Sequence, residues 1–239
     1  MAGKSGGMLA AAALSFVAAS AHASLIWDGD ASKGTGVFKL IGTGNCVGEG
    51  SSSITVVTDS THGKVFKYNK PSDSNRCENH GIKNGSTNVV FANGTLRYFG
   101  WRFKLTTTAN NNANFQWKSY GTGHQQNFPL VLKMVSNQVH YMHTAPGGAS
   151  TYIWKRSISS NQWNHIVLAI NINSSSGWTE LWWNGAKQTM IQGGQRYNGR
   201  TWDVGNHNCP KWGVYGGSGS TMTNYVDGLK VGTTFGDVD

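Results

Sequence analysis

The sequence predicts an all-β domain, a jelly roll or concanavalin-like sandwich of two antiparallel sheets. Short runs of alternating apolar and polar residues recur between turns that are rich in Gly, Asn and Ser. Gly is frequent and dispersed, with 32 residues against 4 Pro, which is typical of a chain with many turns. No convincing amphipathic helix is present, so about ten strands in one domain have to stack as two sheets.

The expected strands follow these alternating runs in chain order. They are Gly63–Tyr68, Tyr98–Leu105, Asn114–Ser119, Leu130–Val135, Gln138–His143, Thr151–Trp154, Trp163–Ile172, Thr179–Trp183, Trp212–Tyr215 and Asn224–Val231. The pair Asn184-Gly185 predicts a tight hairpin between residues 180–183 and 187–191. No low-complexity linker and no fixed-period repeat divides the chain, so we expect a single domain over residues 24–239.

Residues 1–23 have the pattern of a signal peptide. Lys4 supplies the positive charge, residues 8–19 form the apolar run, and Ala21-His22-Ala23 is a small-x-small cleavage pattern before Ser24. The alternative is a membrane anchor, but the apolar run is too short to span a bilayer. We therefore expect a secreted, extracellular protein with no membrane association.

Three Asn-x-Ser/Thr sequons, at Asn84, Asn93 and Asn173, are consistent with a eukaryotic secretory route and a glycoprotein. The three cysteines predict one disulfide and one free thiol in an oxidising compartment. Cys46–Cys77 is the preferred pair because it closes the shorter loop, which leaves Cys209 free. The absence of a Cys-x-x-Cys pair argues against a metal site at the cysteines, and a catalytic Cys is also disfavoured.

The chain is basic, with 20 Lys and Arg against 11 Asp and Glu and a formal net charge of +9. Basic chains bind polyanions, although the charge could serve solubility alone. The sequence has no helical recognition motif, zinc-ligand spacing or Arg-rich run, which argues against nucleic acid as the partner. An acidic polysaccharide is the expected partner, and we expect a monomer.

Acidic residues are too scarce to favour glycoside hydrolysis. Hydrolases mostly need two carboxylates that flank the scissile bond, and this chain has only three Glu residues, Glu49, Glu78 and Glu180. A carboxylate pair from distant strands stays an open alternative. Elimination is a better match, because it needs groups that neutralise a uronate carboxylate, a base and an acid, and it needs no second carboxylate.

Three short segments supply those groups on one face. Read as strands, residues 76–80, 114–118 and 211–215 place every second side chain on the same side. The polar face carries Arg76, Glu78, His80, Asn114, Gln116, Lys118, Lys211 and Tyr215. The opposite face carries Phe115, Trp117, Trp212 and Val214 and is expected to pack into the core.

We assign roles by residue type. His80, Tyr215 and Gln116 are the expected catalytic residues, because His and Tyr transfer protons without adding negative charge beside an anionic substrate. Further residues are expected to bind the substrate: Arg76, Lys118, Asn114, Lys211 and His140. No catalytic cofactor is expected.

Simpler roles stay open for several of these side chains. His80 could be an exposed turn residue, Tyr215 could be a core aromatic with a satisfied hydroxyl, and Arg76 could form a structural ion pair with Glu78. His140 and Tyr141 lie on opposite faces of one strand, so only one of them can face the groove.

Acidic residues near the two ends of the chain suggest a structural calcium site. Chain ends often lie close together in a sandwich, so Asp28 or Asp30 could share a Ca²⁺ ion with Asp227. A structural turn role for these residues is an equal alternative.

The mature chain resembles the fungal glucuronan lyases of polysaccharide lyase family 20. The resemblance rests on residues 70–80, on Trp163-Asn164-His165 with the following Gly-Trp-Thr-Glu-Leu-Trp strand, and on residues 210–215. It is more distantly similar to jelly-roll alginate lyases, which have Arg-x-Glu, Gln-x-His and Lys-Ala-Gly-x-Tyr strands. Here Lys118 replaces the His of the Gln-x-His strand, so the base has to come from elsewhere, and His80 is the candidate.

This resemblance implies a β-jelly roll, a structural Ca²⁺ away from the groove, and β-elimination of a β-1,4-linked polyuronate. We therefore expect a secreted endo-acting lyase that cleaves polyglucuronate. The alternatives are a lyase for alginate or another polyuronate, and a non-catalytic carbohydrate-binding module of the same fold.

Overall fold

The computed structural model describes residues 1, 3, 23–217 and 219–239 and confirms the all-β prediction. Nearly all of the expected signal peptide, residues 1–23, lies outside the described residues. The strands form two large antiparallel sheets and one small sheet, and three short 3-10 helices cover Ala31–Lys33, Thr35–Val37 and Phe235–Asp237.

The larger sheet has nine strands. Its main order is β15 (Ala186–Lys187), β14 (Trp178–Trp183), β13 (Asn164–Ile172), β8 (Thr95–Leu105), β18 (Met222–Gly232), β4 (Gly63–Lys70) and β3 (Ser53–Asp59). Two further strands pair outside this path, β1 (Leu25–Asp28) with β18 and β16 (Tyr197–Asn198) with β14. The β1–β18 pair brings the start of the domain beside its end, as expected for a sandwich.

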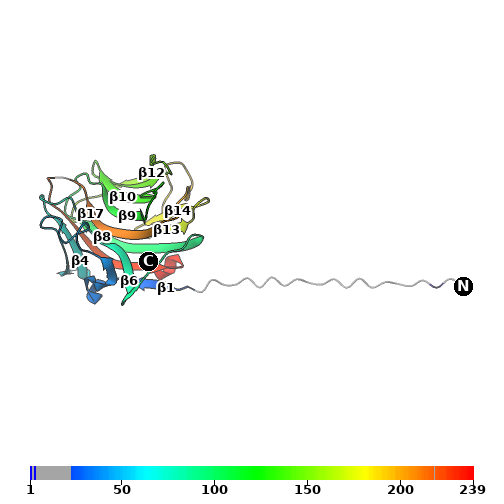
Figure 1. The fold of residues 1–239 in the computed structure, drawn as a ribbon, viewed down its shortest axis with the longest axis horizontal. Coiled ribbons are helices and arrows are strands. Elements are labelled where there is room, and N and C mark those ends of the chain that lie inside the picture. The colour runs from blue at the N-terminus through cyan, green and yellow to red at the C-terminus, as the bar shows by residue number, and fades with distance from the viewer. Residues whose placement is uncertain (2, 4–22, 218) are drawn as a thin grey trace.

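The second sheet has six strands and is stacked on the first (Figure 1). Its order is β12 (Ser150–Ser157), β11 (Gln138–Thr144), β10 (Leu130–Val135), β9 (Ala113–Tyr120), β17 (His207–Tyr215) and β5 (Arg76–Glu78). The small sheet consists of β2 (Phe38–Leu40), β6 (His80–Asn84) and β7 (Thr87–Asn88).

The core lies between the two large sheets. Phe115 and Trp212 of the six-stranded sheet contact Trp101 of β8, with ring centroids 4.9 and 6.0 Å apart. Trp117 packs 5.5 Å from Phe99, and these inner side chains are almost fully buried. The predicted apolar face is therefore confirmed, and the alternate side chains of β9 and β17 point to the outer face of the sheet.

All ten expected strands are present, most of them with changed ends. β10 covers the predicted residues, whereas β17 begins at His207, five residues earlier than expected. The Asn184-Gly185 hairpin is confirmed, with φ values of 49° and 79°. Its second strand ends at Lys187 instead of residue 191, so this part of the prediction was wrong.

Several strands were missed by the sequence reasoning. The longest is β3, an edge strand that pairs only with β4 and whose side chains are mostly half-buried or exposed. Strands are predicted from a regular alternation of apolar and polar residues, and an edge strand such as β3 does not show that alternation. The remaining missed strands are short: β1, β2, β6, β7 and β16. Residues 76–80, which the sequence analysis treats as one strand, form β5 up to Glu78 and begin β6 at His80.

A disulfide and a buried amide hold β5 in place. Cys46 and Cys77 form the expected disulfide, and Cys209 is free and buried. The Asn79 side-chain oxygen accepts from the Trp212 backbone N–H at 3.0 Å, and the Asn79 N–H donates to the Trp212 carbonyl at 3.1 Å. These bonds attach the turn between β5 and β6 to β17, so His80 lies beside β17.

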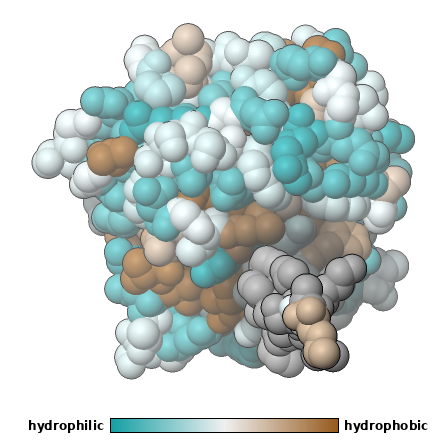
Figure 2. Space-filling model, turned by 90° about the vertical axis from the view of Figure 1, so that its right-hand side faces the viewer, coloured by the Kyte–Doolittle hydropathy of each residue, from teal (hydrophilic) through white to brown (hydrophobic). Residues whose placement is uncertain are grey.

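Hydrophobic residues are unevenly distributed over the face shown in Figure 2. On the face in Figure 2 the upper half is mostly hydrophilic or neutral, and hydrophobic residues gather in the lower half. Among the described residues, no helix has the length and apolar character that a membrane crossing requires.

Candidate active site

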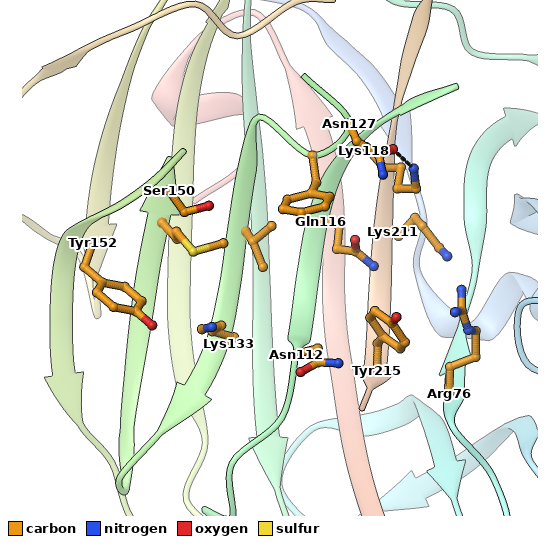
Figure 3. A pocket seen from close by; sticks show the side chains of 13 residues that line it. Arg76, Asn112, Gln116, Lys118, Asn127, Lys133, Ser150, Tyr152, Lys211 and Tyr215 are labelled. Atoms are coloured by element: carbon orange, nitrogen blue, oxygen red, sulfur yellow. Dashed lines mark hydrogen bonds between the residues drawn. The ribbon is translucent and has the colours of Figure 1, made fainter. Parts of the chain in front are cut away.

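A cavity of about 620 Å³ lies on the outer face of the six-stranded sheet (Figure 3). Its lining residues come from β5, β9, β10, β11, β12, β17 and the loops before and after β9. They are Arg76, Asn112, Gln116, Lys118, Asn127, Phe128, Val131, Lys133, Met142, Ser150, Tyr152, Lys211 and Tyr215. The three sequence segments predicted to share a polar face therefore do meet, and five of the predicted site residues line one cavity.

The strand register explains which side chains are neighbours. Gln116 on β9 lies opposite Lys211 on β17, and Tyr215 at the end of β17 lies opposite Arg76 on β5. The close approach of β17 to β5 requires Gly213, which has a φ of 138° and whose added Cβ would lie 2.0 Å from the Cys77 carbonyl oxygen. A glycine here lets Tyr215 and Arg76 lie side by side.

A buried carboxylate lies beneath the cavity. Glu78 has no exposed surface, accepts a hydrogen bond from the Gln116 amide at 2.6 Å and pairs with the Lys211 ammonium at 2.9 Å. A carboxylate can only accept, so the Gln116 nitrogen has to face Glu78, and one amide N–H is left for another acceptor. Glu78 thus fixes the orientation of two groups that line the cavity.

The proposed ion pair between Arg76 and Glu78 does not form. The Arg76 guanidinium lies 3.9 Å from Glu49 and stacks over the Tyr215 ring, with its carbon 4.3 Å from the ring centroid. Figure 3 shows Arg76 and Tyr215 beside each other at one side of the cavity. Tyr215 lines the cavity and is half-buried, so the alternative that it is a fully buried core aromatic is wrong.

The cavity is cationic. It is lined by Arg76, Lys118, Lys133 and Lys211, and no Asp or Glu is among the lining residues. Burial, together with the charge of Lys211, lowers the pKa of Lys118 to about 8. The Lys118 ammonium donates a hydrogen bond to the Asn127 side chain. A cavity with this charge attracts carboxylate-bearing ligands.

His80 does not line the cavity. Its ring stacks on Tyr120, with centroids 3.8 Å apart, near the end of β9 beyond Lys118. Burial and the nearby charges of Lys39 and Lys211 lower the pKa of His80 to about 4, so the imidazole is neutral at neutral pH and can accept a proton. The alternative that His80 is an exposed turn residue is wrong, because it is half-buried and begins β6.

Asn114 and His140 lie outside the cavity lining. Asn114 is buried and accepts a hydrogen bond from the Asn111 amide at 2.7 Å. His140 is also buried, and its ring contacts the cavity residue Tyr152 edge-on, with centroids 4.8 Å apart. The roles assigned to Asn114 and His140 in substrate binding stay predictions.

The sequence reasoning missed the far half of the cavity. Lys133 and Tyr152 contact each other, with the ammonium 5.5 Å from the ring centroid, and they lie with Met142 and Val131 on β10 to β12. Strand parity on the correctly predicted Leu130–Val135 could have found Val131 and Lys133, because they share a face. No sequence motif marks that this face lies beside Gln116.

The three acidic residues expected to bind calcium are each engaged by protein groups. Asp28 pairs with Lys33 at 2.7 Å, Asp30 accepts from the Ser32 backbone N–H at 2.7 Å, and Asp227 lies 2.9 Å from His62. In the described part of the chain they do not form a common group of potential ligands. These residues therefore do not fit one shared ion, and a structural Ca²⁺ stays a prediction.

Comparisons with known proteins agree with this fold. A family model described as polysaccharide lyase matches residues 33–230. The structure is similar to the endo-β-1,4-glucuronan lyase of the fungus Trichoderma reesei, with a TM-score of 0.68 and 16% identity over 90% of this chain and 98% of that one.

Alginate lyases have a similar fold. The alginate lyase vAL-1 from Chlorella virus gives a TM-score of 0.55 and 14% identity over 88% of this chain and 100% of that chain. The family 7 alginate lyase A1-II′ gives 0.54 and 12% identity over 74% of this chain and 82% of that chain. A comparison with curated protein sequences gave no match. Because the family model covers most of the chain, this protein belongs to the polysaccharide lyase family and has its jelly-roll fold.

Proposed function

We propose that this protein is a secreted, endo-acting lyase that cleaves β-1,4-linked polyglucuronate by β-elimination. The main support is the cationic cavity in which Gln116, Arg76 and Tyr215 lie together above the buried Glu78. Membership of the polysaccharide lyase family favours a lyase over a hydrolase or a non-catalytic binding module.

In the proposed reaction, the free amide N–H of Gln116 and the guanidinium of Arg76 bind the uronate carboxylate. They stabilise the negative charge that develops there when the neighbouring C5–H proton is removed. The electrons of that bond form the C4=C5 double bond, and the C4–O bond breaks. The leaving oxygen takes a proton, so the products are a shortened chain and an unsaturated uronate.

Tyr215 and His80 are the proposed proton-transfer residues. Tyr215 lines the cavity and its hydroxyl can protonate the leaving oxygen. His80 is neutral, and its ring stacks on Tyr120, two residues beyond Lys118 on β9. Lys118 is the residue that, by the sequence resemblance, replaces the His of the alginate lyase strand. In the proposal His80 takes the proton, and it has to reach the substrate from beside the cavity.

The choice of glucuronan rests on the similarity to a glucuronan lyase over nearly its whole length. An alginate substrate is the second candidate, because alginate lyases have a similar fold. The resemblance of Gln116-Trp117-Lys118 to their Gln-x-His strand also favours it. Secretion is proposed from the signal-peptide pattern at residues 1–23.

The test is ultraviolet absorbance of the protein mixed with glucuronan, alginate and polygalacturonate in parallel. Elimination creates a conjugated double bond that absorbs, whereas hydrolysis and binding do not. We expect a rise with glucuronan and a rapid fall in its viscosity, which shows internal cleavage. A rise with alginate alone would show that the substrate is alginate and not glucuronan. No rise with any polymer would overturn the proposal.

The pH dependence of kcat/KM should be bell-shaped. Below about pH 4 protonation of His80 removes the base, and above about pH 8 loss of the Lys118 proton weakens substrate binding. The measurement is kcat/KM on glucuronan across this range for the wild type and for Lys118→Arg, which stays charged. In Lys118→Arg the fall of kcat/KM on the alkaline side of the profile should move to higher pH. An unchanged alkaline side would contradict the role of Lys118.

A further inference from the structure

We propose that His80, His207 and Cys209 form a Zn²⁺ site at the edge of the catalytic face, and that metal bound there inhibits the enzyme. The inhibition rests on the proposed role of His80 as base, whereas the metal site does not. One ligand atom from each of the three side chains lies within 4.8 Å of the other two. Among the residues that the structure describes, this is the one such group of three.

The strand geometry produces this cluster. His207 and Cys209 are two residues apart on β17, so they lie on the same face, opposite Tyr120 and Lys118 of β9. The hydrogen bonds between Asn79 and Trp212 hold the start of β6 against β17 and bring His80 to the same place. The sequence reasoning missed the site because His80 and His207 are 127 residues apart in the chain.

The chemistry of the three groups suits zinc. Imidazole nitrogen and thiolate sulfur are the usual Zn²⁺ ligands, and three protein ligands leave a fourth position open. The His80 Nε2 atom is buried and has no hydrogen-bond partner, so its bonding capacity is unused in the described structure. Buried polar atoms of this kind normally have a partner, which a bound metal would supply.

The geometry needs only a small adjustment. In a tetrahedral site the ligand atoms would lie about 3.5 Å apart, given Zn–N and Zn–S bonds of about 2.1 and 2.3 Å. His207 is exposed, and both imidazole rings stack on Tyr120, with centroids 5.7 Å away for His207 and 3.8 Å away for His80. Cys209 is buried and has to lose its proton on binding, as metal-bound thiols do.

Bound metal inhibits because it uses the nitrogen lone pair with which His80 would accept a proton. A metal bound to His80 occupies a ring nitrogen and holds the imidazole in a fixed position, so the side chain can no longer accept the substrate proton. Turnover should then fall toward that of a variant without the base, on the order of 100-fold below the metal-free rate. Chelation of the metal should restore it. Ca²⁺ and Mg²⁺ prefer oxygen ligands and should have no such effect.

The test uses Co²⁺ as a spectroscopic probe of the full-length protein, because Co²⁺ bound to a thiolate absorbs in the near ultraviolet. We expect this charge-transfer band at equimolar Co²⁺, its displacement by Zn²⁺, and its loss in Cys209→Ser. His207→Gln should weaken Co²⁺ binding. The matched control is His165→Gln on β13, which removes a partly buried imidazole elsewhere and should retain the band.

Turnover on glucuronan is measured in the same samples. Cys209→Ser should keep the metal-free rate and lose the inhibition by Zn²⁺. Absence of the Co²⁺ band in the wild type, or an unchanged band in Cys209→Ser, would overturn the site. A band that depends on Cys209 in a protein without lyase activity would support the site and overturn the proposed function instead.

Discussion

Replacement of Tyr215 by Phe is expected to lower turnover on glucuronan at least ~100-fold, the scale of general acid–base catalysis. The change removes only the hydroxyl, while the ring can still stack under the Arg76 guanidinium, 4.3 Å from its centroid in the wild type. We therefore expect the loss in kcat and little change in KM. The measurement is steady-state kinetics by ultraviolet absorbance.

His80→Ala is the companion variant and should also lose at least ~100-fold, because the proposed base is removed. A melting curve for each variant checks that the fold is retained, which matters most for His80 because its ring packs on Tyr120. Nearly unchanged turnover in Tyr215→Phe would remove this residue from the mechanism. Unchanged turnover in His80→Ala alone would leave both proton transfers to Tyr215.

Replacement of Glu78 by Ala should destabilise the protein by about 3–5 kcal/mol, because it leaves a buried charge without its partner. Lys211 is only 2% exposed and its ammonium lies 2.9 Å from the Glu78 carboxylate. The same change removes the acceptor that orients the Gln116 amide, so turnover should fall as well. Urea unfolding and kinetics on the same preparation measure the two effects.

The double variant Glu78→Leu with Lys211→Met separates these effects. It replaces a buried ion pair by apolar side chains, which is often neutral for stability or stabilising. We expect most of the lost stability to return and the activity to remain low, because Gln116 is still without its acceptor and the cavity has also lost the Lys211 ammonium. Full recovery of activity would show that Glu78 has no positioning role.

Much of the site could be predicted because it depends on local periodicity. Alternation along 114–118 and 211–215 separates Gln116 and Lys211 from Phe115 and Trp212, and the structure places them on opposite faces. The free thiol at Cys209 was predicted correctly, because three cysteines leave one unpaired and Cys46–Cys77 closes the shorter loop. The ion pair between Glu78 and Lys211 was not predicted, because Lys211 approaches Glu78 from another strand.

The sequence by itself determined the strand-rich fold, the inward and outward faces of its central strands, and the basic charge of the chain. These properties follow from the order of apolar, polar and turn-forming residues along short segments. Only the tertiary structure decided that Lys133 and Tyr152 complete the cavity, that His80 lies beside it, and that Cys209 meets two imidazoles. Such contacts depend on strand order and register between distant segments, which the local pattern of side chains does not specify.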